Sequence, residues 1–203
     1  TISPDAKIIQ IDPSEAEIGR NRGVSLGIVG DIEAIAGQLT EEASRHSWSD
    51  LPWLKELQQA RDEQVRFLES LAVSETPMHA MFVHKTVSEM LRDDDSLAFD
   101  GGDFCHFGKA YHPSRTPKSW SYLSPMGMLG SALPAAMTAK LAYPERRSIM
   151  FTGDGAFGFN GMEFDTAVRH NLPVVAIMGN DAAWGIDRQI QLQVFGKPVV
   201  TDL

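Results

Sequence analysis

Uninterrupted runs of apolar residues recur in the second half of the chain, at residues 97–99, 148–151 and 174–178. None shows the alternation of apolar and polar positions that marks a strand with one face in water, so we expect strands buried on both faces. Stretches compatible with helices, roughly residues 130–141 and 161–170, lie between them. This alternation predicts an α/β fold, with an open parallel sheet and helices on both of its faces.

The first half of the chain is patterned differently. Residues 7–12 predict a short strand, and Asp31 is placed to cap a helix. After a polar stretch at residues 41–50 we expect a helix with one apolar edge. Its apolar positions are Leu54, Leu57, Val65, Leu68 and Leu71. Thr76 and Pro77 predict the N-cap and first turn of the next helix. The inner face of that helix is expected to carry Ala80, His84, Val87 and Leu91.

The composition narrows the classes of function. Hydrophobic residues make up 43% of the 203 positions, enough for a packed core, and 27 acidic against 18 basic residues give a net charge of −9. This balance argues against a nucleic-acid partner, which is usually bound by a basic patch. Cys105 is the single cysteine, which excludes an intrachain disulfide and fits a reducing compartment. Because the sequence has no signal peptide and no apolar run of about 18–20 residues, we expect a soluble, cytoplasmic protein without a membrane partner.

Glycine and an acidic residue follow each of the three apolar runs, at residues 100–103 (DGGD), 153–155 (GDG) and 179–181 (GND). The carboxyl ends of parallel strands share the edge where open α/β sheets bind ligands, so we expect these turns to converge. Mg²⁺ prefers carboxylate and phosphate oxygens, and Asp154 and Asp181 can supply the protein ligands. Each turn alone is more often only a tight turn. Their repetition at three strand ends predicts a phosphate and metal site.

The spacing of two of these turns resembles a known signature. Gly-Asp-Gly at 153–155, 24 intervening residues and Asn-Asp at 180–181 resemble the motif of thiamine-diphosphate-dependent enzymes, whose second pair is usually Asn-Asn. Three further stretches resemble acetolactate synthase, benzaldehyde lyase and 2-hydroxyacyl-CoA lyase, at residues 124–130, 155–164 and 171–175. Residues 9–31 are similar to the end of that family's middle domain. The resemblance therefore covers nearly the whole chain.

The resemblance implies a division into three parts. Residues 1–40 would be the C-terminal end of a middle domain, and residues 41–76 would be a helical linker. Residues 77–203 would form the thiamine-diphosphate domain that binds the diphosphate and the metal, incomplete at its C-terminus.

Ligands for the metal and the diphosphate are implied residue by residue. Mg²⁺ would bind the side chains of Asp154 and Asp181 and the backbone carbonyl of Ala183. Asp181 departs from the asparagine usual in the family, which adds a negative charge beside the diphosphate and can weaken binding. Contacts to the diphosphate are implied for Gly102, Asp103, Gly155 and Ala156.

Four further residues are implied to contact the cofactor. Met126 matches the bulky apolar residue that bends the cofactor into a V shape, so that its aminopyrimidine nitrogen reaches thiazolium C2. The carbonyl of Ser124, at a position that is often glycine, would accept a hydrogen bond from that nitrogen. Trp184 and Gly185 follow the second metal residue and resemble benzaldehyde lyase. Without the resemblance, a methionine before a helix predicts core packing.

Histidine and cysteine offer no competing chemistry at the level of sequence. His79 and His84 are five residues apart and fall on different sides of a helix, so they do not form a metal pair. No Cys or His lies at ligand spacing from His106, His112 or His170. Cys105 has no neighbouring base, so we expect an inert, buried thiol.

We therefore expect a carboligase or lyase that depends on thiamine diphosphate and Mg²⁺, resembles acetolactate synthase, and acts on 2-keto acids or 2-hydroxy ketones through the thiazolium ylid. The alternatives are an enzyme of the 2-hydroxyacyl-CoA lyase or oxalyl-CoA decarboxylase type, and a non-catalytic homologue that only binds the cofactor. A phosphotransferase is disfavoured because no P-loop sequence occurs. A flavin (FAD) fits the resemblance, but no residue of this chain indicates one.

The resemblance also places part of the active site elsewhere. The glutamate that protonates the aminopyrimidine is expected outside this chain, on a pyrimidine-binding domain of the same or a neighbouring subunit in a homodimer or homotetramer. Glu163, after the second turn, is expected at the surface instead. The 203-residue chain alone is therefore expected to be inactive.

Overall fold

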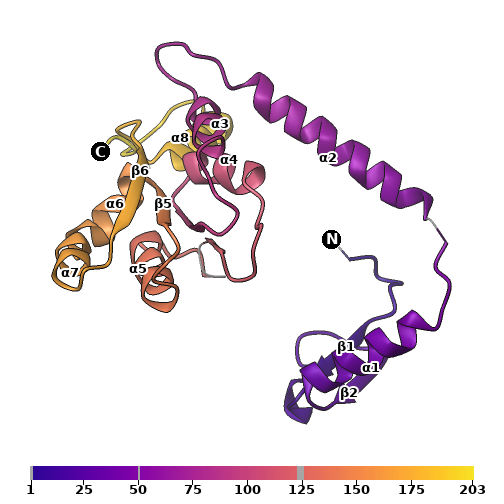
Figure 1. Cartoon of the computed structure of the whole chain (residues 1–203). Helices are drawn as coiled ribbons and strands as arrows, with labels where there is room; N and C mark the ends of the chain where they lie inside the picture. The colour runs from indigo at the N-terminus through magenta and orange to yellow at the C-terminus, as the bar shows by residue number, and fades with distance from the viewer. Residues whose placement is uncertain (1, 50, 123–125) are drawn as a thin grey trace. The chain divides into compact units, whose positions relative to one another are not determined.

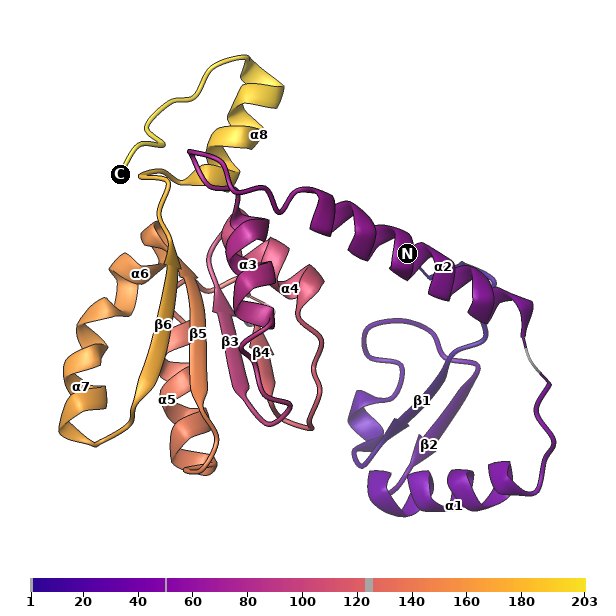
Figure 2. The ribbon, with the colours of Figure 1, turned by 45° about the horizontal axis from the view of Figure 1, so that its top comes forward.

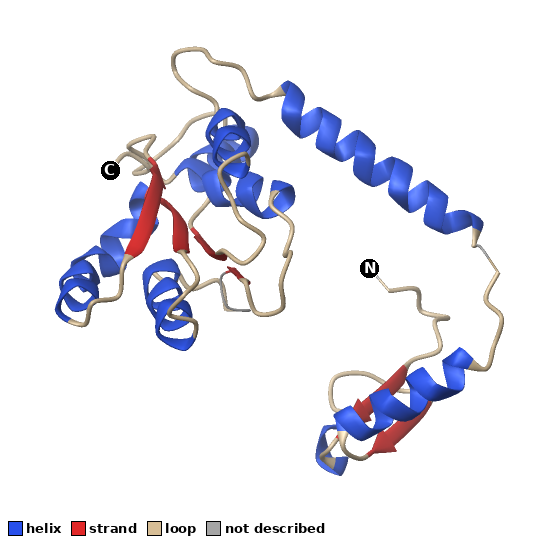
Figure 3. Ribbon diagram, in the orientation of Figure 1, coloured by secondary structure: helices blue, strands red, loops and turns tan. Residues whose placement is uncertain are grey.

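The computed structural model describes residues 2–49, 51–122 and 126–203. The chain divides into two compact units, Thr1–Glu56 and Leu57–Leu203. Each unit is a separate α/β arrangement (Figure 3).

The first unit is a small parallel βα arrangement. Strand β1 (Ile9–Asp12) pairs in parallel with β2 (Leu26–Val29), and a short 3-10 helix, η1 (Glu15–Glu17), lies in the connection. Helix α1 (Ile32–Ser44) follows, and the Asp31 carboxylate accepts a hydrogen bond from the Ala34 N–H at 2.8 Å, which confirms the predicted cap. The alternation in residues 26–29 is too brief to mark a strand, so sequence reasoning missed β2.

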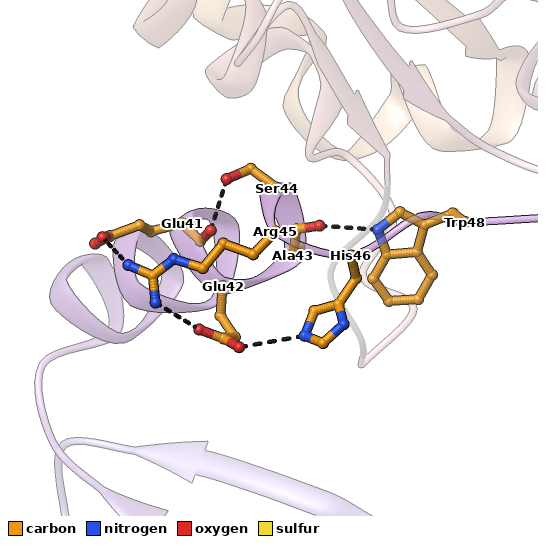
Figure 4. A network of polar contacts seen from close by, with 7 residues as sticks. All are labelled: Glu41, Glu42, Ala43, Ser44, Arg45, His46 and Trp48. Atoms are coloured by element: carbon orange, nitrogen blue, oxygen red, sulfur yellow. Dashed lines mark hydrogen bonds and ion pairs between the residues drawn. The ribbon is translucent and has the colours of Figure 1, made fainter.

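The last turn of α1 carries a network of exposed polar contacts (Figure 4). Arg45 pairs with Glu41 at 2.6 Å and with Glu42 at 2.9 Å. The Trp48 indole donates to the Ala43 carbonyl at 3.0 Å, and the same carbonyl also accepts the His46 N–H at 3.2 Å. Exposed ion pairs contribute little to stability, so this network caps the helix rather than supporting a site.

The second unit holds the larger sheet, which runs in the order β4-β3-β5-β6 with every pair parallel. Its strands are β3 (Ser96–Asp100), β4 (Trp120–Tyr122), β5 (Ser148–Gly153) and β6 (Val174–Gly179). Its helices are α3 (Ala80–Ser88), α4 (Asp103–Tyr111), α5 (Ala132–Ala142), α6 (Asp154–Asn160), α7 (Phe164–Arg169) and α8 (Gly185–Phe195), with the 3-10 turn η2 (Gly161–Glu163) after α6. Most of α2 (Pro52–Ser70) also belongs to this unit.

Helices cover both faces of this sheet, which confirms the predicted fold class (Figures 1 and 2). On one face, Leu97 and Phe99 of β3 pack with Cys105 of α4. On the other face, Ala98 packs with α5 residues such as Leu133. Alternate residues of β3 thus enter two cores, which explains its uninterrupted apolar sequence.

The structure corrects two expectations about these elements. β6 lies at the edge of the sheet and Val175 is 53% exposed, so burial on both faces holds for β3 and β5 but not for β6. The helix expected to begin at Thr76 begins at Ala80, because the His79 ring accepts the Met81 N–H at 3.1 Å and so supplies the cap. Pattern reading also missed β4, α4, α6 and α8, which are short or carry glycine.

Candidate cofactor and metal site

The three turns of glycine and acidic residues meet at the carboxyl edge of the sheet. β3 pairs with β5 through Asp100 and Thr152, and β5 pairs with β6 through Gly153 and Gly179, so all three strands end at the same level. A cavity of about 540 Å³ opens there and is lined by residues from each turn. The expected convergence of the turns therefore holds in the structure.

Most of the residues singled out from the sequence line this cavity. They are Gly102, Asp103, Asp154, Gly155, Ala156, Asp181, Ala183, Trp184 and Gly185. Met126 is not in the lining and is 85% exposed, so the alternative that it packs in the core is wrong, while its contact with the cofactor stays a prediction. Ser124 lies outside the described residues.

Other residues of the cavity were not found from the sequence. Pro77, Met78, Ala80 and Val83 form an apolar wall. His106 also lines the cavity, and its Nε2 lies 3.3 Å from the Tyr122 hydroxyl at the end of β4. No sequence motif marks these residues, because they lie in elements outside the three glycine turns and only the fold brings them to the cavity.

Asp154 gives the clearest sign of what the cavity could hold. Its Oδ1 accepts a hydrogen bond from the Gly155 N–H at 3.0 Å. Its Oδ2 is buried and has no hydrogen-bond partner among the described residues. An unpaired buried carboxylate oxygen is costly, and a cation at the cavity would satisfy it.

Glycine is required where the backbone segments of the site come together. Gly101 has φ of 95°, and a Cβ there would lie 2.8 Å from the Gly153 nitrogen. A Cβ at Gly155 would lie 2.7 Å from the Trp184 ring. These glycines let the backbone segments approach closely beside the Asp154 carboxylate, an arrangement that suits a diphosphate bound through a divalent cation.

Within the described residues, no group of three or more His, Cys, Asp or Glu side chains is placed to hold a metal ion. A site here would therefore rest on the carboxylates of Asp154 and Asp181 together with backbone and ligand oxygens. Mg²⁺ is commonly bound in this way, through one or two carboxylates plus phosphate oxygens. The residues present fit the implied cation.

A second buried carboxylate, Asp100, lies at the end of β3. Its Oδ2 accepts the Ala132 N–H of α5 at 3.1 Å, while its Oδ1 is buried without a partner among the described residues. Burial raises the pKa of Asp100, against the opposing effect of the backbone N–H groups of residues 130–132 and Gly101. Asp100 therefore links the first glycine turn to the start of α5, a role that sequence reasoning did not assign.

Two histidines that are far apart in sequence meet behind the site. His84 Nδ1 lies 3.2 Å from His112 Nε2, and His84 Nε2 lies 2.8 Å from the Phe104 carbonyl. Both side chains are buried, and burial lowers the pKa of His84 to about 4 and that of His112 to about 3. No histidine lies at ligand spacing from His112 in the sequence, as expected, but the fold places His84 beside it.

Cys105 and Glu163 agree with their predictions. Cys105 is fully buried, and burial raises the pKa of its thiol to about 12, so the thiol is inert. Glu163 is exposed and accepts a hydrogen bond from the Thr166 hydroxyl at 2.6 Å.

Fold and turn geometry define an α/β protein whose ligand site lies at the carboxyl edge of a parallel sheet. Residues 100–202 match the family described as thiamine pyrophosphate enzyme, C-terminal TPP binding domain. The chain belongs to this thiamine pyrophosphate enzyme family, which confirms the resemblance drawn from its motifs.

Curated relatives carry several activities. Acetolactate synthase large subunit IlvG of Mycobacterium tuberculosis is 35% identical over 97% of this chain and 36% of its own length. 2-Hydroxyacyl-CoA lyase 2 of Homo sapiens is 33% identical over 100% of this chain and 33% of its own length. Sulfoacetaldehyde acetyltransferase of Alcaligenes xylosoxydans xylosoxydans is 28% identical over 96% of this chain and 36% of its own length. The chain thus spans about a third of the length of these relatives.

None of the helices in the described part of the chain is long and apolar enough to cross a membrane.

Proposed function

We propose that this chain binds thiamine diphosphate through Mg²⁺ at the carboxyl edge of its larger sheet. The observation that carries the proposal is the buried Oδ2 of Asp154, which has no hydrogen-bond partner in the described part of the chain and borders a cavity between three glycine turns. The side chains of Asp154 and Asp181 and the carbonyl of Ala183 would hold the cation. Backbone N–H groups of Gly155 and Ala156 would bind the diphosphate, while Gly102 and Asp103 border it from the opposite turn.

For the parent protein we propose a carboligase or lyase that forms or cleaves a carbon–carbon bond next to a carbonyl in 2-keto acids or 2-hydroxy ketones. Bound thiamine diphosphate supplies the nucleophilic carbon and the electron sink for this reaction. The protein's share is to bind the diphosphate, orient the rings and exclude water. The relative named acetolactate synthase, which matches 97% of this chain, supports this reaction class.

A 2-hydroxyacyl-CoA lyase is the second candidate, because the human protein of that name matches the full length of this chain. The two candidates are distinguished in the full-length protein by supplying pyruvate or a 2-hydroxyacyl-CoA and measuring acetolactate or aldehyde. A protein that binds the cofactor and turns over neither would instead be a non-catalytic homologue.

We propose that a pyrimidine-binding domain completes the site, in the same or a neighbouring subunit of a homodimer or homotetramer. The first unit would then be the end of a middle domain. Its exposed apolar side chains, such as Ile9 and Val29, support this, since they would be covered in a larger domain.

The binding proposal is tested with Asp154→Ala in the full-length protein, with Asp165→Ala as the matched control. Asp165 is an exposed carboxylate whose partner is Arg169 on the same helix, away from the cavity. Calorimetry should show that Asp154→Ala loses Mg²⁺-dependent binding of thiamine diphosphate while Asp165→Ala keeps the parent affinity. Unchanged affinity in Asp154→Ala would remove Asp154 from the ligands and the Gly-Asp-Gly turn from the site.

A further inference from the structure

The loop that carries two of the three proposed metal ligands is paired with the segment at residues 201–203. The Trp184 N–H donates to the Thr201 carbonyl at 2.7 Å, and the Leu203 N–H donates to the Ala182 carbonyl at 2.9 Å. Together these bonds form an antiparallel bridge between Ala183 and Asp202. We call residues 201–203 the strap and residues 180–184 the metal loop.

The pattern of these bonds determines which backbone groups of the loop stay available. In an antiparallel pair of this kind, the bonds come from the residues on either side of the bridged pair, and the bridged residues direct their own N–H and C=O away from the partner strand. The strap therefore bonds to Ala182 and Trp184 but leaves the carbonyl of Ala183 unused. Ala183 is 3% exposed and lines the cavity.

Backbone angles show that the pairing imposes a conformation with a local cost. Ala182 has φ of 54° and Val200, just before the strap, also has φ of 54°. Residues with a Cβ seldom adopt such angles, and a β-branched residue such as valine does so least readily. This backbone persists only where surrounding contacts fix it. The two bridge bonds, and the Asn180 side chain that accepts the Ala182 N–H at 2.9 Å, are such contacts.

Helix α8 connects the loop to the strap and anchors the strap as well. The Gln191 side chain accepts the Val199 N–H at 2.6 Å. Arg188 lies 3.8 Å from the exposed carboxylate of Asp202, an ion pair too long and too exposed to contribute much. The strap is therefore held by its two backbone bonds to the metal loop, and the exposed hydrogen bond of Gln191 fixes Val199 just before it, whereas its charges contribute little.

From these contacts we propose that the strap is a positioning element for the metal loop, so that it sets the affinity of the site for Mg²⁺. By fixing Ala182 and Trp184 it directs the Ala183 carbonyl toward the cavity before any cation binds. A loop without the strap would have to be ordered when the metal binds, and this ordering would weaken binding. This inference rests on the proposed function.

The test compares Leu203→Pro with Leu203→Ala in the full-length protein. Leu203→Pro removes the N–H that bonds to Ala182, whereas Leu203→Ala keeps the N–H and removes only a side chain that is 57% exposed. Magnesium affinity is measured by titrating MgCl₂ into protein with thiamine diphosphate, followed by calorimetry. Hydrogen exchange of the Trp184 amide, measured without metal or cofactor, reports the bridge itself.

We expect Leu203→Pro to weaken Mg²⁺ binding by about three- to ten-fold, the effect of one lost backbone hydrogen bond, and to lose protection of the Trp184 amide. Leu203→Ala should match the parent in both measurements. Lost amide protection with unchanged Mg²⁺ affinity would overturn the proposal, and so would unchanged protection. A parent protein that shows no Mg²⁺-dependent cofactor binding would refute the proposed function and this inference with it.

A second pair of variants tests the strap without introducing proline. Gln191→Ala removes the anchor at Val199, and Gln189→Ala is its control, an exposed glutamine on the same helix. Gln191→Ala should weaken Mg²⁺ binding by about two- to five-fold, within the range for one hydrogen bond, while Gln189→Ala should not. Equal affinities in the two variants would contradict the positioning role, even if Leu203→Pro failed to fold.

Discussion

The buried pair of His84 and His112 should make the protein sensitive to mild acid. The Phe104 carbonyl can only accept, so His84 Nε2 carries a proton and His84 Nδ1 is left as the acceptor for the His112 Nε2–H. Protonation of His84 would place two N–H groups against each other in a buried site. The pair is therefore neutral in the folded protein, and both pKa values lie below the ordinary value of 6.5.

The sign of the effect follows from linkage. Below pH 6.5 the unfolded chain takes up a proton at each histidine, while the folded protein does not until the pH approaches about 4 at His84 and about 3 at His112. Stability is lost as the pH falls through this window. At about 1.4 kcal/mol for each pH unit and each histidine, acidification from pH 7 to pH 5 should cost roughly 2 kcal/mol per histidine, or roughly 4 for the pair.

Urea unfolding at pH 7 and pH 5, followed by circular dichroism, measures this loss. Carboxylates also titrate as the pH falls, so the comparison is with His84→Gln, which removes one of the two buried sites, and with the exposed control His170→Gln. The loss of stability between the two pH values should be smaller by about 2 kcal/mol in His84→Gln and unchanged in His170→Gln. If His84→Gln and the parent lose the same free energy, the pair is not neutral in the fold and the reasoning fails.

Two further predictions concern Met126 and Asp95. Because Met126 is 85% exposed, Met126→Ala should change the free energy of unfolding by less than about 0.5 kcal/mol, whereas a buried methionine would cost about 2–5. In the full-length protein Met126→Ala should slow the exchange of the cofactor C2 proton, measured by NMR, whereas Met126→Leu should exchange it at the parent rate. Equal exchange rates in the two variants would show that Met126 does not bend the cofactor. The Asp95 carboxylate is buried and bonds to Arg147 and the Arg92 N–H; burial alone would raise its pKa, but these partners hold the pKa below its usual value. Asp95→Asn should therefore lower the free energy of unfolding at pH 7 by about 1–3 kcal/mol, measured by urea unfolding. This difference from the parent should shrink below about pH 4, where the Asp95 carboxylate becomes protonated. A difference that stays constant with pH would contradict the ion pair.

The sequence by itself determined the class of fold and the chemistry of its ligand edge. Uninterrupted apolar runs bounded by glycine turns, such as residues 97–99, favour strands with two covered faces, so they predict the parallel sheet, although the edge strand β6 is not covered on both faces. The turns that follow these runs need no tertiary information to be found, because parallel strands oblige their carboxyl ends to lie together. Spacing between residues 155 and 180 then identified the family.

Only the tertiary structure decided contacts between segments that lack a shared pattern. His84 and His112 are 28 residues apart and belong to different elements, so no spacing rule brings them together. Likewise, the pairing of Ala183 with Asp202 depends on how α8 returns the chain, which periodicity does not encode. Periodicity reports whether a side chain faces a core, whereas these contacts join backbone and polar atoms whose partners are fixed by the packing of whole elements.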